Sequence, residues 1–257
     1  MRALITGASS GIGRDIARVL SGMGYDLVLV ARRKDRLEEL KQTLKTKVEI
    51  ISLDLSEAEN CYALYEQTGE IDVLINNAGF GLFGDFLETD LEEELKMLRV
   101  NSQAMHILMK LYLSDFVKRD SGYILNVASA AGFMPGGPLL NTYYATKAYI
   151  LNLSRGVSRE LKKQKSRVVL SVLCPGPVQT EFEAVAGVDF ASVGLKSETV
   201  ARYAIRKLFR GKRVIVPGII FKLGRLLTKI LPDSVLLSAA YIIQAPRRRA
   251  VEGKRHA

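Results

Sequence analysis

The sequence is poor in the residues on which metal sites, disulfide frameworks and histidine-based catalysis depend. Among its 257 residues there is no tryptophan, and there are only two cysteines, Cys61 and Cys174, and two histidines, His106 and His256. So few residues cannot supply a disulfide framework or a clustered metal site, and they leave little for a histidine-centred triad. The sequence therefore predicts a protein of the reducing cytoplasm that holds no metal ion.

Long hydrophobic runs are also missing. The longest uncharged, apolar-rich run near the C-terminus covers residues 234–246, which is too short to span a bilayer, and charged residues interrupt the segment before it. The first apolar segment starts at Ala3 and leads straight into a glycine turn, so we expect no signal or transit peptide. These features predict a soluble protein.

Positive charge is concentrated at one end of the chain. The net charge is +10, but residues 196–257 carry fifteen Lys or Arg residues against three acidic ones, whereas residues 1–195 carry 22 against 24. No nucleic-acid recognition motif accompanies this charge, so we expect no nucleic-acid partner.

Short apolar runs alternate with longer amphipathic segments as far as about residue 216, which is the pattern of repeated βα units around a parallel sheet. Several of these runs are almost continuously apolar, as in strands that are covered on both faces. The predicted strands cover residues 2–6, 26–30, 48–53, 71–76, 122–127, 167–173 and 213–216. The predicted helices cover residues 11–23, 33–46, 57–67, 89–118, 142–164 and 197–210.

No linker, repeat or low-complexity block divides the chain. We therefore predict an α/β fold with a single doubly wound Rossmann-type domain over residues 1–217, in which a seven-stranded parallel sheet carries helices on both faces. Residues 218–257 are predicted to form a basic helical extension of this domain, with helices at 219–231 and 233–245.

A glycine-rich turn joins the first predicted strand to the first helix, in the stretch Thr6-Gly-Ala-Ser-Ser-Gly-Ile-Gly13. Glycines at such a turn let the backbone approach a pyrophosphate, whose charge then meets the free amides of the helix N-terminus. The alternative is a purely structural turn. The predicted cofactor contacts here are Gly7, Ser9, Ser10, Gly11, Ile12 and Gly13.

The end of the second predicted strand reads Val30-Ala-Arg-Arg-Lys34. Dinucleotide folds that prefer NAD place an acidic residue here for the ribose hydroxyls. Arg32 and Arg33 instead begin a helix, where the macrodipole disfavours cations unless an anion is bound. We interpret them as contacts of a 2′-phosphate, which predicts NADP(H); the alternative is a solvated, basic helix start.

Two further strand ends complete the predicted cofactor site. Asp54, with Leu55 beside it, offers an acceptor for the adenine amino group. The alternative is that Asp54 is the N-cap of the next helix. The fourth strand ends in Asn76-Asn-Ala-Gly79, where Asn77, Ala78 and Gly79 would lie beneath the cofactor ribose.

Tyr143 and Lys147 stand four residues apart, and Ser129 precedes Tyr143 by fourteen residues. On a helix these two residues share a face, so the ammonium can favour ionisation of the phenol and make Tyr143 a proton donor at neutral pH. An ordinary helix-surface contact is the alternative. Tyr144 also competes, because it lies three residues from Lys147.

With these motifs in this order, the chain closely resembles the short-chain dehydrogenase/reductase family over roughly residues 2–217. Besides the glycine turn and the Asn76 to Gly79 stretch, the matching motifs are Asn101, Asn126-Val-Ala-Ser129, Tyr143-x-x-x-Lys147 and Pro175-Gly-Pro-Val-Gln-Thr180. The ending of the chain looks more like the 3-ketoacyl and hydroxysteroid reductase branch than like the glycine-rich ending of many members.

The resemblance implies a catalytic tetrad of Asn101, Ser129, Tyr143 and Lys147. Tyr143 is then the general acid in reduction, and Ser129 binds the substrate oxygen. Lys147 binds the nicotinamide ribose, and Asn101 holds a water in a proton relay. Residues along the nicotinamide are implied to be Pro175, Gly176, Val178 and Thr180.

The loops beyond the strand ends are apolar, at residues 80–83 and 133–139, and residues 182–195 are predicted to close as a lid. We therefore expect a hydrophobic ketone, aldehyde or 3-oxoacyl substrate, and a homodimer or homotetramer. The basic, apolar C-terminal segment is hypothesised to contact an anionic membrane or an acidic carrier, unless it only shapes the pocket or a dimer interface. The alternative function is a non-catalytic NADP(H) sensor.

Overall fold

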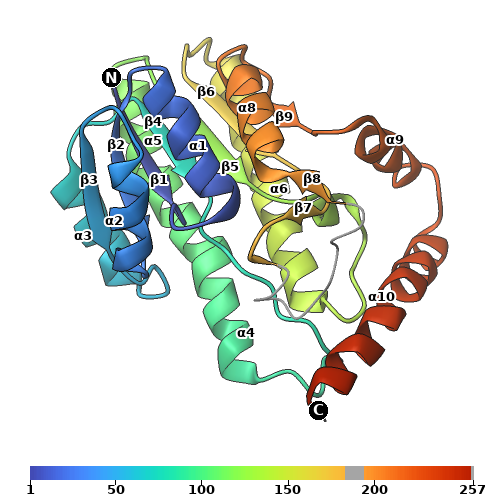
Figure 1. Ribbon diagram of the computed structural model, residues 1–257. Coiled ribbons are helices and arrows are strands. Elements are labelled where there is room, and N and C mark those ends of the chain that lie inside the picture. Colours follow the sequence, from blue (N-terminus) through green and yellow to red (C-terminus); the bar gives the residue numbers. More distant parts are fainter. Residues whose placement is uncertain (183–193, 256–257) are drawn as a thin grey trace.

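The seven predicted strands form one parallel sheet. The computed structural model describes residues 1–182 and 194–255, with side chains as far as residue 245, and its sheet has the order β3-β2-β1-β4-β5-β6-β9 (Figure 1). The strands are β1 (Arg2–Thr6), β2 (Asp26–Ala31), β3 (Val48–Ser52), β4 (Val73–Asn76), β5 (Tyr123–Val127), β6 (Val169–Leu173) and β9 (Val214–Ile215). Their ends lie within two residues of the predicted ones, so the Rossmann-type sheet is confirmed.

Alternate residues of the central strands point into two separate cores. In β1, Leu4 packs in one apolar cluster, whereas Ala3 and Ile5 pack in the other, and Val28 and Leu27 of β2 divide in the same way. One face of the sheet is covered by α1 (Gly11–Gly22), α2 (Lys34–Gln42) and α8 (Ser197–Leu208), and the other by α3 (Ala58–Thr68), α5 (Met105–Lys118) and α6 (Asn141–Lys163). Burial on both faces explains why the strand sequences are continuously apolar.

The strand order shows at which end of the sheet a ligand site is expected. β1 pairs with β2 on one side and with β4 on the other, so the connections run in opposite directions from β1. In open α/β sheets, ligands bind outside the carboxyl ends of the strands at such a switch point. Thr6 at the end of β1 and Asn76 at the end of β4 therefore mark the expected site.

The segment predicted as one helix over residues 89–118 is divided in the structure. It consists of α4 (Leu91–Leu98), a π-helical turn η1 (Arg99–Ala104) and α5. A π turn inserts an extra residue into the helical ladder and re-aims the side chains around it. Asn101 lies in this turn and is fully buried.

Five further elements complete the fold. The unpredicted 3₁₀ turn η2 (Ala130–Phe133) follows β5, and β7 (Val178–Gln179) pairs with β8 (Leu195–Lys196) in a small second sheet. The two predicted C-terminal helices are α9 (Ile219–Leu227) and α10 (Asp233–Arg255), which runs farther than predicted and lies with α9 at the red end of the chain (Figure 1). Within the described residues, no helix combines the length and apolarity needed to cross a bilayer.

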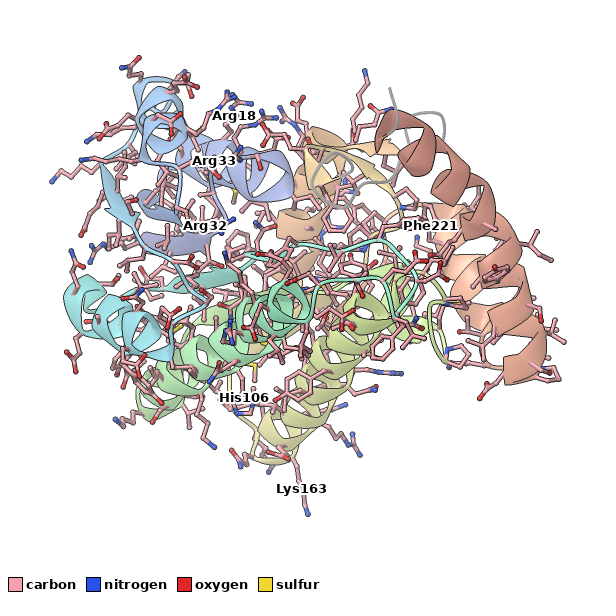
Figure 2. The ribbon with its side chains drawn as sticks, turned by 90° about the horizontal axis from the view of Figure 1, so that it is seen from below. Arg18, Arg32, Arg33, His106, Lys163 and Phe221 are labelled. Carbon is pink, nitrogen blue, oxygen red and sulfur yellow. The ribbon has the colours of Figure 1, made fainter. Side chains whose placement is uncertain are left out.

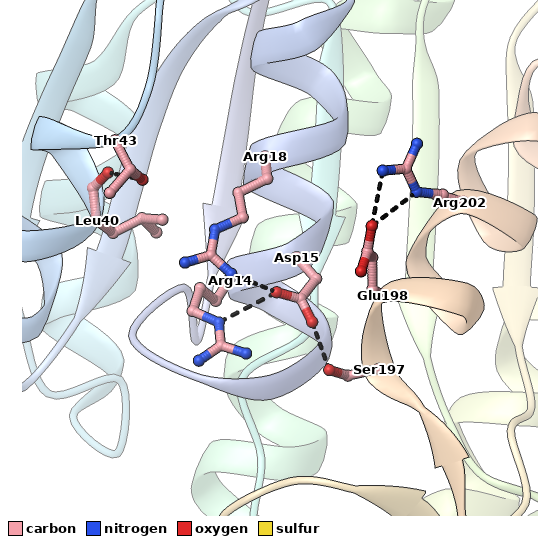
Figure 3. A network of polar contacts seen from close by, with 8 residues as sticks. All are labelled: Arg14, Asp15, Arg18, Leu40, Thr43, Ser197, Glu198 and Arg202. Atoms are coloured by element: carbon pink, nitrogen blue, oxygen red, sulfur yellow. Dashed lines mark hydrogen bonds and ion pairs between the residues drawn. The ribbon is translucent and has the colours of Figure 1, made fainter.

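A buried carboxylate fixes α1 against α8. Asp15 is 3% exposed, and it accepts hydrogen bonds from Arg14 and Arg18 of its own helix, each at 3.1 Å, and from the Ser197 hydroxyl at the start of α8 (Figure 3). A buried carboxylate is costly unless such partners satisfy it. The network therefore holds the first turn of α1 in a defined position at the carboxyl end of β1.

Candidate functional site

One cavity of about 470 Å³ opens at the carboxyl ends of the strands. Nineteen of the predicted site residues line it, and they come from segments that are distant in the sequence. These are Gly7, Ser9, Ser10, Gly11, Ile12, Arg32, Arg33, Asp54, Leu55, Asn77, Ala78, Gly79, Ser129, Tyr143, Lys147, Pro175, Gly176, Val178 and Thr180. The two other predicted residues, Gly13 and Asn101, do not line the cavity, and they contact residues that do.

The glycine turn leaves no room for side chains. Gly7 has a φ of +64°, and a Cβ on it would lie 2.8 Å from the Ala78 Cα. A Cβ on Gly13 would lie 2.4 Å from the Gly7 carbonyl oxygen. Both glycines are therefore required for the close approach of the turn to the end of β4.

Asn77, the second of the paired asparagines at the end of β4, binds the glycine turn through its side chain. Its side-chain amide donates to the carbonyls of Thr6 and Gly7, each at 3.0 Å, and its backbone N–H and that of Ala78 donate to the Thr6 hydroxyl. These bonds tie the glycine turn to β4. Ser10 precedes α1 without a side-chain cap, so the first amides of the helix keep their capacity for an anion.

Arg32 and Arg33 line the cavity on the side of the N-terminal elements (Figure 2). Arg32 lies 3.8 Å from Asp54, while Arg33 pairs with Glu181 at 2.7 Å and donates to the Ser9 hydroxyl at 3.2 Å. The guanidinium of Arg33 holds the pKa of the Glu181 carboxyl below its usual range. Both arginines are about half exposed and are therefore accessible to an anionic ligand.

Asp54 takes part in a local turn as well as in the cavity wall. Its Oδ1 accepts from the Ser56 backbone N–H at 3.0 Å, ahead of α3. Burial raises its pKa, but the bonds from Ser56 and the charge of Arg32 outweigh burial and keep that pKa below the ordinary value. The carboxylate is therefore charged at neutral pH. Glu57 is the N-cap residue of α3, so the N-cap role considered for Asp54 is wrong, and its contact with adenine stays a prediction.

Tyr143 and Lys147 project from α6 towards Ser129, which follows β5. Tyr143 shares a hydrogen bond with Ser129, and the Lys147 ammonium lies 5.5 Å from the centre of the tyrosine ring. The Lys147 Nζ donates to the Val127 carbonyl oxygen at 3.1 Å. The helix and the strand end therefore bring the three predicted polar groups to one end of the cavity.

The predicted lowering of the Tyr143 pKa is wrong for the protein without ligands. Burial raises the pKa of Tyr143 to about 12, against the smaller opposite effect of the Ser129 hydrogen bond. Burial also lowers the pKa of Lys147 to about 8. The sequence pattern predicts the proximity of the two groups but not their desolvation, which disfavours the charged form of each.

Asn101 is held by two neighbouring segments. Its Nδ2 donates to the Phe80 carbonyl at 2.9 Å and to the Thr146 hydroxyl at 3.1 Å, and its Oδ1 accepts from the Phe80 N–H at 3.0 Å. A Cβ on Gly79 would lie 2.8 Å from that oxygen. Asn101 thus positions the loop after β4 beside Lys147, and its implied water-holding role stays a prediction.

The structure separates the two adjacent tyrosines. The Tyr144 hydroxyl accepts a hydrogen bond from the Gln244 amide of α10 at 3.1 Å, and its ring packs against Gly137. Tyr143 instead shares its bond with Ser129. Tyr143 is therefore bonded to a residue of the predicted tetrad, whereas the Tyr144 hydroxyl is bonded to α10.

An apolar cluster lies next to Tyr143. Phe83, Leu139 and Leu140 are buried there, with Tyr143, Tyr144 and Phe182 partly buried around them. Of the other predicted apolar residues, Phe133 packs against the main core and under Arg225 instead. The predicted lid, residues 182–195, falls largely on residues 183–193, which lie outside the described part of the chain.

Two polar residues, one lining the cavity and one beside it, were not predicted from the sequence. Nothing in the sequence indicates that Glu181 belongs to the site, because an acidic residue is not expected beside a predicted phosphate site. Gln244 is 2% exposed and follows Leu236 and Ala240 at intervals of four on the buried side of α10. A polar residue in such an apolar row is a signal that periodicity analysis could have found.

The cysteines and acidic residues form no alternative site in the described part of the chain. No group of three or more His, Cys, Asp or Glu side chains there could hold a metal ion. Cys61 and Cys174 are both buried, and burial raises the pKa of their thiols to about 11 and about 12. Such thiols are unreactive at neutral pH.

Comparison with known proteins agrees with this geometry. A family model described as short chain dehydrogenase matches residues 1–188. An uncharacterized oxidoreductase of Staphylococcus epidermidis is 33% identical over 220 residues, covering 83% of this chain and 93% of that protein. The very-long-chain 3-oxoacyl-CoA reductase of Anas platyrhynchos is 32% identical over 221 residues, covering 77% of this chain and 70% of that protein.

A solved structure of a short-chain dehydrogenase is similar to this chain over most of its length. The short-chain dehydrogenase from Sphingobium yanoikuyae in complex with NADPH matches with a TM-score of 0.78 and 29% identity, over 90% of this chain and 96% of that one.

Proposed function

Since the chain belongs to the short-chain dehydrogenase family, we propose that it is an NADP(H)-dependent oxidoreductase that interconverts a hydrophobic carbonyl compound and its alcohol. The observation that carries this proposal is the arrangement of one cavity, with two arginines at one end and Ser129, Tyr143 and Lys147 at the other. A proton donor and a nicotinamide cofactor are the two components that carbonyl reduction needs.

The cavity fits a dinucleotide phosphate. The turn at Gly7 and Gly13 excludes side chains, and the uncapped start of α1 offers backbone amides for a pyrophosphate. Arg32 and Arg33 would bind the 2′-phosphate, in exchange for their contacts with Asp54 and Glu181. Lys147 would bind the nicotinamide ribose, and the segment around Pro175 would line the nicotinamide.

The bound cofactor would supply the hydride, and this chain's own residues would manage the proton. With a pKa of about 12, the Tyr143 hydroxyl is protonated at neutral pH and is therefore in the state that proton donation requires. Ser129 would donate a hydrogen bond to the same substrate oxygen, where negative charge develops. Lys147, when protonated, would stabilise the tyrosinate that remains.

The apolar cluster beside Tyr143 supports a hydrophobic substrate. Leu140 and Phe182 of this cluster line the cavity and offer no charged anchor, and the duck relative named above acts, by its name, on very-long-chain 3-oxoacyl-CoA. A non-catalytic NADP(H) sensor is the alternative function. Such a sensor would not need the Ser129, Tyr143 and Lys147 arrangement.

Turnover with NADPH tests the proposal directly. The purified protein is incubated with NADPH and a panel of cyclic ketones, aromatic ketones, aliphatic aldehydes and 3-oxoacyl thioesters, and the loss of reduced nicotinamide absorbance is followed. We expect oxidation of NADPH with the more apolar members and slower oxidation of NADH. Tight NADPH binding without turnover across the whole panel would favour the sensor.

The buried lysine predicts a pH dependence of cofactor binding. The pKa of Lys147 is about 8 in the free protein, and hydrogen bonds to the ribose oxygens would raise it in the complex. The complex then binds more protons than the free protein, so NADPH affinity should fall as the pH rises from about 8. Fluorescence titrations between pH 7 and about 10 measure this, with Lys147→Met as the variant that should lose the dependence.

A further inference from the structure

Helix α9 turns its apolar side outwards. Ile219, Ile220, Leu223, Leu226 and Leu227 are each more than half exposed, and no residue of this helix is buried. At 100° per residue, these five side chains fall within an arc of about 120°. In an ordinary surface helix such an arc faces the core, so the orientation of α9 is reversed.

The opposite side of α9 faces the protein. The Phe221 ring lies against Gly176, where an added Cβ would come within 2.1 Å of it, and Phe221 is partly buried on the main core (Figure 2). The guanidinium of Arg225 lies 5.0 Å from the centre of the Phe133 ring. These contacts fix the orientation of the helix, so its aliphatic arc cannot turn inwards without breaking them.

Helix α10 continues the exposed apolar surface. Leu236, Ala240 and Gln244 are buried, whereas Ile242 and Ile243 are at least 60% exposed. More than half of the exposed large hydrophobic residues in the described part of the chain lie between residues 219 and 243. Concentrated apolar exposure of this kind marks an interaction surface.

Cations border this surface. Lys222 lies on one flank of the aliphatic arc, Arg225 lies on the protein-facing side of α9, and Lys229 follows in the next turn. Lys222 shares the Tyr203 ring of α8 with Arg206 and Lys207, at 5.6–5.8 Å from the ring centre. Among the described residues, none of these five cations has an ion-pair partner, so their charges remain available to external anions.

We propose that α9 and the start of α10 lie in the interfacial region of an anionic lipid bilayer, with the aliphatic arc of α9 inserted and its cations at the headgroups. A helix with an exposed aliphatic side and neighbouring cations is suited to this position. Burial of its aliphatic side chains in the bilayer and attraction of its cations to anionic headgroups both favour binding. A two-fold contact between copies would instead bring the same cations of both chains together, which is unfavourable.

A second cavity supports the choice of an anionic headgroup. It has about 290 Å³ and lies between α6, η2 and the region of α9, where Arg155, Arg225 and Lys229 line it together with Asp233. With three cations and one carboxylate, the charged lining of this cavity has a net positive charge. A phosphate headgroup of a lipid beneath α9 could enter there, while its acyl chains meet the aliphatic arc.

Co-sedimentation of the full-length protein with vesicles tests the proposal. We expect binding to phosphatidylcholine vesicles that contain phosphatidylglycerol and much weaker binding to phosphatidylcholine alone. Leu223→Ser/Leu227→Ser should reduce the partition coefficient by roughly tenfold or more. Lys222→Gln/Lys229→Gln should reduce it roughly tenfold at about 0.1 M salt and much less at about 0.5 M salt.

Leu87→Ser is the matched control, because Leu87 is a fully solvent-facing leucine, 95% exposed, in a different loop. It should bind like the wild type. Absence of wild-type binding, or unchanged binding of the leucine double variant, would overturn the proposal. Light scattering without vesicles provides the other test: a wild-type dimer that the leucine variant dissociates would assign this surface to a second copy instead.

Discussion

Replacing Tyr143 with phenylalanine should lower kcat for carbonyl reduction by about 10²–10⁴-fold, the range that a positioned general acid contributes. The ring, its packing against Phe182 and its place beside Lys147 would remain, so only the proton donor is lost. NADPH affinity should change little, because the hydroxyl is bonded to Ser129 at the substrate end of the cavity. Steady-state kinetics with an active ketone and a separate binding titration measure the two effects.

Tyr144→Phe is the matched control for this substitution. It removes the hydroxyl that Gln244 contacts, and it leaves the bond between Ser129 and Tyr143 in place. We expect it to change KM more than kcat, because Tyr144 belongs to the apolar cluster beside the reacting groups. If Tyr144→Phe abolished turnover while Tyr143→Phe remained active, the assignment of the proton donor would be wrong.

Replacing Arg32 and Arg33 together by alanine should weaken NADPH binding by about 10²–10³-fold, since each charge-assisted hydrogen bond to a phosphate contributes roughly 1.5–3 kcal/mol. NADH lacks the 2′-phosphate, so its affinity should change less than about threefold. The ratio of the two dissociation constants, measured by nicotinamide fluorescence, reports the effect without depending on turnover.

Lys41→Ala provides the control for charge alone. Lys41 lies in the last turn of α2, on the same helix that follows Arg33, and it does not line the cavity. An equal loss of NADPH and NADH affinity in the arginine double variant would contradict a 2′-phosphate role. That result would assign the two arginines to the fold of the glycine turn or to the pyrophosphate.

The sheet could be predicted because its signal is local. Central strands, such as β2 from Leu27 to Val30, are apolar on both faces and are followed by polar or glycine-containing turns. The cofactor turn was also predictable, since Gly7 and Gly13 are required by backbone contacts that no other residue permits. The position of the site then follows from strand order.

Other features depend on contacts that the sequence does not contain. The π turn around Asn101 interrupts a segment whose amphipathic pattern is compatible with one continuous helix. The raised pKa of Tyr143 follows from burial, which outweighs the neighbouring cation. In α9, the apolar periodicity is visible in the sequence, but the contact of Phe221 with Gly176 decides that the aliphatic side faces outwards.

The contact between Phe221 and Gly176 joins the large cavity to helix α9. Gly176 lines the wall of the cofactor cavity, and Phe221 belongs to the helix proposed to lie on lipid. If lipid binding shifts Phe221, it changes the free energy of cofactor binding by some amount. Thermodynamic reciprocity then requires the cofactor to change lipid affinity by the same factor, so occupancy of the cofactor cavity would govern how much of the protein resides at a membrane.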